Sequence, residues 1–187
     1  MLLVITFNQI LTAFLGALIA LLLKAGYDAV VEHRRLETIR KMIYTDLVLQ
    51  EKKLKVHITE YDSMIEAFKG ESSNIGVSHY NLINTNIYKA HTEKDYFKAF
   101  KTDEFNDLME IYINLKEMEK FDVKAFIEVY ESKRAELRAA RNFEGIDTLD
   151  DRYLNRAGVK RGTVISTIIR VETFLTKYKT TYPDYLY

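Results

Sequence analysis

The sequence has 187 residues, a length that suits one domain or a small domain with an appendage. Its 27 basic and 27 acidic residues cancel, so no global field points to duplex nucleic acid or to an anionic membrane. It has no cysteine, which excludes disulfides and thiolate sites, and one proline and seven glycines, so few residues would interrupt a mainly helical fold.

The N-terminal segment is uncharged up to Lys24. A helix needs about 20 mostly apolar residues to cross about 30 Å of hydrocarbon, and Leu2 to Leu23 meets that length. A soluble core helix would carry a charged face, and a signal peptide would have a basic start and a shorter apolar run. We therefore predict that residues 1–24 are a transmembrane anchor whose partner is the lipid bilayer.

Positive charge around this anchor predicts its orientation. Basic residues cluster just after it, and cationic flanks stay on the cytoplasmic side; they are Lys24, Arg34, Arg35, Arg40 and Lys41. We expect a single-pass protein of the inner or cell membrane, with its N-terminus outside and its C-terminal domain in the cytoplasm.

One stripe of the anchor collects small and polar residues at steps of three and four. They are Thr6, Gln9, Ala13, Gly16 and Ala20. Small residues allow close approach of helices in lipid, and amides can hydrogen-bond across them, so the stripe predicts self-association and, one step further, a pore lining. The alternative is that small residues are common in any span and the terminal amides reach the headgroups.

Residues 25–70 predict a long juxtamembrane helix that ends near Gly70. Apolar residues recur at steps of mostly three or four, with Gln50 in the one gap: Leu36, Ile39, Ile43, Leu47, Leu54, Ile58, Tyr61, Ile65 and Phe68. If this helix continues the anchor, the two form a stiff rod.

Residues 71–187 form the remainder of the predicted cytosolic domain. The stretch 70–81 reads as a loop, and 81–91 as a short helix or strand. Thr102 to Glu104 predicts a helix start. The stretch from Phe121 to Ala140 is also predicted to be helical, either as the same helix or after a break at Phe121–Asp122.

Residues 142–145 predict the end of that helix, and Gly158 and Gly162 a turn. Thr163 to Tyr178 then forms a last helix or, because 163–171 is β-branched, a strand start. The expected fold is mainly α: one N-terminal transmembrane helix and a cytosolic bundle of about four or five helices, with short β elements allowed.

We find no catalytic motif and expect a protein that is not an enzyme and holds no metal or cofactor. His57 and Glu60 share a helix face, but a lone histidine on a charged helix is typically solvated, and a metal site needs several converging ligands. Asp147, Asp150 and Asp151 lie at an expected helix start, where capping explains them.

Residues 152–170 contain five cations and no acid. Arginines pair bidentately with phosphates, so the stretch predicts an anion-binding surface; its cations are Arg152, Arg156, Lys160, Arg161 and Arg170. The alternative is pairing with acids of the bundle, such as the 147–151 cluster.

A second candidate surface is rich in asparagine, whose side chain can read an adenine edge through paired donor and acceptor. Its residues are His79, Tyr80, Asn81, Asn84 and Asn86. The alternative is that asparagine favours turns for local reasons.

A layout of one uncleaved span, a helical cytosolic domain with stretches such as KDYFKAFKTDEFNDLMEIY (94–112), and an anion-binding surface resembles the type III CRISPR ancillary membrane effectors. The resemblance implies antiviral defence, a homo-oligomer with a tetramer favoured, and cyclic tetra-adenylate, a cyclic oligonucleotide, as the ligand whose binding perturbs the membrane. A membrane-anchored interaction or signalling module, or a holin-like protein, without a nucleotide ligand is the alternative.

Overall fold

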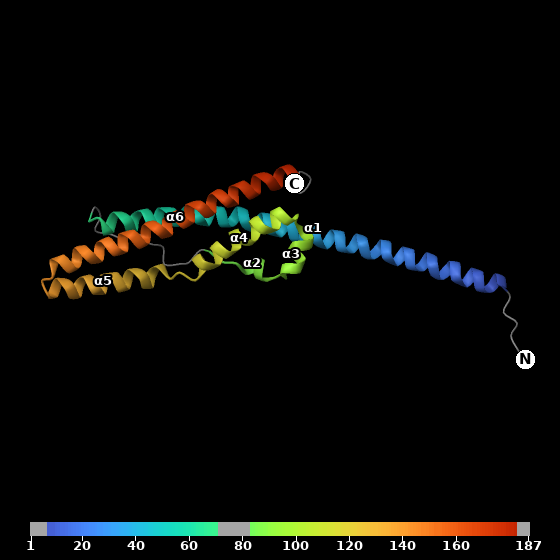
Figure 1. The fold of residues 1–187 in the computed structure, drawn as a ribbon, viewed down its shortest axis with the longest axis horizontal. Coiled ribbons are helices and arrows are strands. Elements are labelled where there is room, and N and C mark those ends of the chain that lie inside the picture. Colours follow the sequence, from blue (N-terminus) through green and yellow to red (C-terminus); the bar gives the residue numbers. More distant parts are fainter. Residues whose placement is uncertain (1–6, 71–82, 183–187) are drawn as a thin grey trace, which may run out of the picture.

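The computed structural model describes residues 7–70 and 83–182. These residues form six helices and no strand (Figure 1), which confirms the mainly α prediction. The helices are α1 (Phe7–Phe68), α2 (Asn86–Lys89), α3 (Glu93–Ala99), α4 (Thr102–Glu119), α5 (Val123–Ala139) and α6 (Phe143–Thr181).

The first helix, α1, joins the predicted anchor to the domain without a break. It has 62 residues, about 93 Å at 1.5 Å per residue. Every side chain from Leu11 to Val31 is exposed, and the first buried residue is Ile39. The N-terminal half of α1 therefore projects alone, while its C-terminal half lies inside the domain (Figure 1).

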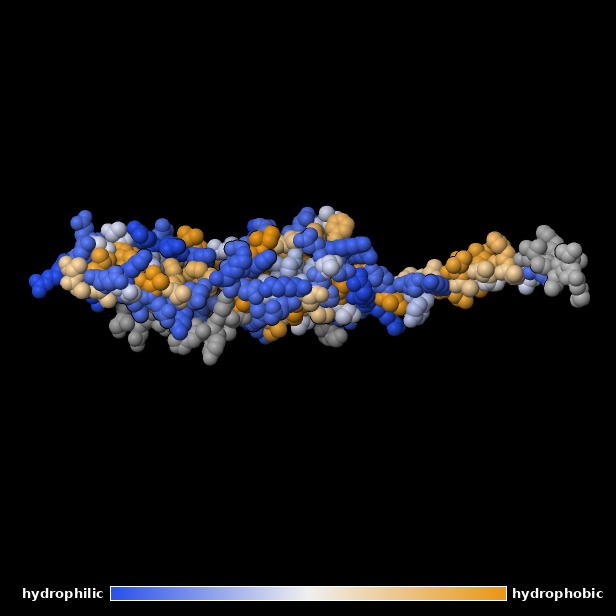
Figure 2. All heavy atoms as spheres, turned by 90° about the horizontal axis from the view of Figure 1, so that it is seen from below, coloured by the Kyte–Doolittle hydropathy of each residue, from blue (hydrophilic) through white to orange (hydrophobic). Residues whose placement is uncertain are grey.

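The projecting half of α1 contains a stretch that is long and apolar enough to cross a membrane. Its mean hydropathy reaches 1.8, and none of that stretch is buried against the rest of the protein. Figure 2 shows the hydrophobic surface of this half and the hydrophilic surface where it meets the domain. Leucines exposed to this degree need an apolar environment that the chain itself does not supply.

The last helix, α6, holds the domain together. It packs along α1 and also contacts α4 and α5, while α3 contacts α1 and α4. The guanidinium of Arg40 lies over the ring of Tyr182, 5.0 Å from its centroid. The C-terminal end of α6 therefore lies where α1 leaves the domain (Figure 1).

The buried face of α1 follows the predicted periodicity, and Gln50 in the apparent gap is fully buried. Its amide Nε2 donates to the carbonyl of Asn84 at 2.6 Å and to Asp46 at 3.1 Å. Tyr112 of α4 donates its hydroxyl to the other oxygen of Asp46. The polar gap in the pattern is thus a buried hydrogen-bonded network between α1, α4 and the segment before α2.

The predicted turn at Gly158–Gly162 and the strand alternatives are wrong within the described residues. Both glycines lie inside α6, residues 163–171 continue it, and the described part of 81–91 contains α2. The buried face of α6 continues past the glycines through Ala157, Val164 and Ile168. This tertiary packing outweighs the roughly 1 kcal/mol by which each glycine disfavours a helix.

The helix boundaries are otherwise set by caps. The predicted starts at Thr102 and after the Phe121–Asp122 break are confirmed. The predicted end of that helix before 142–145 is also confirmed, because α5 ends at Ala139. Arg141 takes a positive φ of 53°, and Asn142 then accepts a hydrogen bond from the Gly145 amide at 2.9 Å and caps α6, which follows directly.

The core of α1 gives a first prediction. Leu54→Ala should lower the free energy of unfolding by about 2–5 kcal/mol, because Leu54 is fully buried and its truncation leaves a cavity. Leu49→Ala, at a site 46% exposed on the same helix, is the matched control and should cost much less. Denaturant unfolding in detergent micelles measures both, and equal losses would contradict the assigned helix rotation.

Alkaline stability gives a second prediction. Burial raises the pKa of Tyr61, Tyr96 and Tyr112, and burial with a hydrogen bond to Asp150 raises the pKa of Tyr130 to about 12. Above about pH 10 the unfolded chain loses tyrosine protons that the folded chain keeps, so stability present below that pH falls as pH rises. Tyr130→Phe should make the fall shallower in denaturant titrations from about pH 9 to 12, and an unchanged slope would contradict the Tyr130 assignment.

Candidate functional site

The predicted anion-binding cations lie on the first half of α6, which packs against α5. Arg152, Arg156 and Lys160 are spaced four residues apart and therefore follow one edge of the helix. Arg152 and Arg156 are exposed, and Lys160 is half-buried. We call these three residues the α6 basic edge.

Aromatic rings support two members of the α6 basic edge. The guanidinium of Arg156 lies 5.9 Å from the ring centroid of Phe126, and the ammonium of Lys160 lies 4.6 Å from that of Phe121. Both are cation–π distances. A phosphate can still approach these cations, because the ring neutralises no charge.

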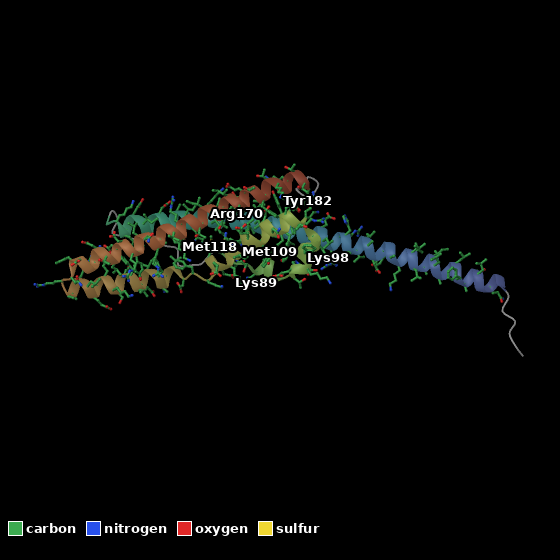
Figure 3. The ribbon with its side chains drawn as sticks, viewed as in Figure 1. Lys89, Lys98, Met109, Met118, Arg170 and Tyr182 are labelled. Carbon is green, nitrogen blue, oxygen red and sulfur yellow. The ribbon has the colours of Figure 1, made fainter. Side chains whose placement is uncertain are left out.

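The remaining cations of the stretch are engaged with carboxylates. Arg161, a predicted ligand-binding residue, pairs with Asp62 of α1, and Arg170 pairs with Glu110 of α4 at 2.6 Å. Figure 3 labels Arg170 on the part of α6 that runs beside α1. The alternative of intramolecular pairing is therefore confirmed for these two arginines, although their partners lie on α1 and α4 and not at 147–151.

Asp150 has a structural role that differs from the predicted capping. It lies inside α6 and accepts hydrogen bonds from the Tyr130 hydroxyl at 2.8 Å and from Arg134 at 2.9 Å. Both donors belong to α5. Asp150 thus joins α5 to α6 below the basic edge.

Arg152 also lines an open groove of about 710 Å³ at the turn between α5 and α6. Lys133 adds a second cation, and Glu136 and Glu144 add two acids. The groove therefore carries charges of both signs, and it shares Arg152 with the α6 basic edge.

The described part of the asparagine-rich candidate surface, Asn84 and Asn86, is not brought to the basic edge within one chain. Asn84 lies beside Gln50 of α1, whereas Arg161 lies beside Asp62, about 18 Å further along the same helix. Asn86 is exposed as the first residue of α2. His79, Tyr80 and Asn81 lie outside the described residues.

The sequence reading missed a buried ionisable pair on α1. His57 Nδ1 lies 2.8 Å from Glu60 Oε2, and both side chains are more than nine-tenths buried, so the prediction of a solvated histidine is wrong. The apolar periodicity of α1 does indicate this burial, because His57 and Glu60 lie on the same helical face as Leu54 and Tyr61. Within the described residues no group of three metal-ligand side chains converges.

The anchor stripe is partly described. Gln9, Ala13, Gly16 and Ala20 are exposed, and a Cβ built on Gly16 would meet nothing within 4 Å. Thr6 lies outside the described residues. A second helix could approach this stripe closely.

No family model matches the sequence, no curated protein matches it, and no solved structure matches its fold. Function is therefore inferred from two features of the chain itself, the unaccompanied apolar half of α1 and the α6 basic edge.

The link between α5 and α6 gives a third prediction. Asp150→Ala removes the acceptor of two half-buried donors and should destabilise the protein by about 1–3 kcal/mol. Asp151→Ala is the matched control, because Asp151 is exposed on the same turn and its loss should change stability by less than about 0.5 kcal/mol. Thermal unfolding in detergent compares them; a harmless Asp150→Ala would show that the two hydrogen bonds carry no stability.

Proposed function

We propose that the protein is a single-pass membrane effector whose cytosolic domain senses an anionic ligand and relays its state to the membrane through α1. The N-terminus lies outside, and the domain lies in the cytoplasm. The observation that carries the proposal is the continuity of α1, which runs without a break from an apolar, unaccompanied half into the buried core of the domain.

Continuity matters because a helix is stiff over this length. A repacking that rotates or tilts the core half of α1 must rotate or tilt the apolar half, since no turn between them absorbs the motion. The ligand acts by favouring one of two arrangements of the bundle. Membrane leak or depolarisation is the proposed output.

The ligand we propose is a cyclic oligoadenylate, with cyclic tetra-adenylate as the specific candidate from the resemblance of layout. The α6 basic edge supports an anionic ligand, because none of its three cations forms an ion pair within the described residues. Arginine pairs with phosphate bidentately, so Arg152 and Arg156 would supply the phosphate contacts. Arg161 pairs with Asp62 of α1 and so holds α6 against α1 beside the α6 basic edge.

A homo-oligomer, with the tetramer favoured, agrees with the outward face of α6. Opposite the buried face, its exposed residues are uncharged over most of the helix: Asn155, Gly158, Gly162, Ser166, Ile169, Thr173, Thr176 and Thr180. When all spans enter one bilayer, the symmetry axis is normal to the membrane, and residues near that axis face their own copies. An uncharged face avoids the like-charge contacts that such packing would otherwise create.

Ligand binding gives a fourth prediction. Full-length protein in nanodiscs should show a thermal shift with cyclic tetra-adenylate, because a ligand that prefers the folded state stabilises it. Arg152→Ala with Arg156→Ala should weaken binding by about tenfold or more, since each charge-assisted contact contributes roughly 1.5–3 kcal/mol. Arg170→Ala, whose cation pairs with Glu110, is the control and should bind like the wild type.

A wild-type protein that shows no shift would reject the nucleotide ligand and favour the interaction or holin-like alternative. If the double variant and the wild type bind with equal affinity, the α6 basic edge is not the binding site, although the ligand itself is still supported.

Coupling through α1 gives a fifth prediction. Four glycines inserted after Val31 should abolish ligand-dependent leak from liposomes while leaving ligand binding intact, because glycine destabilises a helix by about 1 kcal/mol per residue. Four alanines at the same point keep the helix and add about one turn, so leak should persist. A glycine variant that leaks like the wild type would contradict a rigid relay.

A further inference from the structure

The surface at α3 and the start of α4 combines three lysines with an exposed aromatic ring; Lys101 is the residue that precedes α4. Lys94, Phe97, Lys98 and Lys101 are all exposed, and Phe97 keeps 58% of its surface accessible. Tyr96 and Ala99, on the opposite side of the helix, are buried. We call these four exposed residues the α3 face.

The α3 face lies at the end of the domain from which the apolar half of α1 emerges. The ammonium of Lys98 bonds Glu32 of α1 at 3.0 Å, and Arg35 bonds Asp95 of α3 at 2.8 Å. Figure 3 shows Lys98 where α1 leaves the domain. Lys94 is one turn earlier on the same edge and therefore faces the same way as Lys98.

The spacing along α1 brings this face to the height of lipid headgroups. From Lys24, where the uncharged stretch ends, to Glu32 is about 12 Å of helix. The headgroup layer extends about 5–8 Å beyond the hydrocarbon on each side, and lysine side chains extend several ångströms toward it. A tilt of the span brings the face closer still.

We propose that the α3 face docks on the anionic lipid surface of the membrane that holds the span, with lysines on headgroup phosphates and Phe97 in the interface. The inference rests on the proposed span. Lys94 and Lys101 form no ion pair within the described residues, whereas Lys98 shares its charge with Glu32. Of the acids of α3, Asp95 is held by Thr92 and Arg35, and Glu93 is exposed beside Lys94, so the lysines outnumber the exposed acid. Phe97 contacts Phe105 edge-on at 5.6 Å between ring centroids and yet stays mostly exposed.

Docking at this second point fixes how the domain sits on the bilayer. One helix through a membrane leaves the domain free to rotate about the helix axis and to tilt. A second contact away from that axis removes this freedom. A change in domain packing then tilts or rotates the span, because the domain as a whole can no longer rotate on the membrane surface. The anionic lipid content of the membrane would then regulate the effector.

Tryptophan fluorescence tests this contact directly, because the chain contains no tryptophan. Full-length Phe97→Trp is reconstituted into vesicles of equal phosphatidylcholine and phosphatidylglycerol that carry a spin-labelled headgroup quencher. Phe143→Trp is the matched control, since Phe143 is also exposed but lies at the far turn between α5 and α6. Leu18→Trp with a deep acyl-chain quencher reports the span.

Trp at position 97 should be quenched, while Trp at position 143 should not. Replacing phosphatidylglycerol with phosphatidylcholine, or adding Lys94→Glu and Lys101→Glu, should reduce the quenching at 97 by about twofold or more, since each lysine near an anionic surface contributes to attraction. Quenching that is insensitive to both changes would overturn the role of anionic lipid.

If Trp at position 97 is quenched no more than Trp at position 143 while Trp at position 18 is quenched, the docking proposal is rejected and the membrane span is retained. That result would favour a protein partner for Phe97. If the deep quencher does not reach Trp at position 18, the membrane span itself is rejected. The two failures are therefore distinguishable.

Discussion

The single helix α1 combines an exposed apolar half, long enough to span a membrane, with a half that packs in the domain, and the rest of the structure depends on that combination. From Leu11 to Val31 every side chain is exposed and most are apolar, while from Ile39 onward α1 turns a mostly apolar face toward the domain and carries most of its charges outward. An unbroken helix suits both halves because its backbone groups bond internally, which lipid requires and water tolerates. A break between the halves would free the span from the domain.

Buried polar groups set the rotation of α1 within the domain. Asp46 and Gln50 of α1 meet Tyr112 of α4 and the carbonyl of Asn84, both outside α1. Such groups contribute less to stability than to specificity, because another rotation would leave them buried without partners. The domain therefore favours particular rotations of α1 over intermediate ones, as the proposed relay between domain and span requires.

The sequence predicted the elements that depend on periodicity and capping. The apolar repeat from Ile39 to Phe68 and the helix start at Thr102 follow from local chemistry and agree with the structure. The turn predicted at Gly158 and Gly162 is absent because the packing of α6 against α1, α4 and α5 outweighs the low helix propensity of glycine. Pairing of Arg161 with Asp62 joins residues distant in sequence, so composition alone could not separate this arginine from the α6 basic edge.

The central claim is that α1 is one rigid helix from bilayer to core, and a distance across the junction tests it most directly. The chain has no cysteine, so spin labels at Leu23→Cys and Lys52→Cys are unique, and both positions are exposed. In bilayers diluted with unlabelled chain, double electron–electron resonance should give one narrow distribution near about 44 Å. A broad distribution, or one centred well below that distance, would contradict the account.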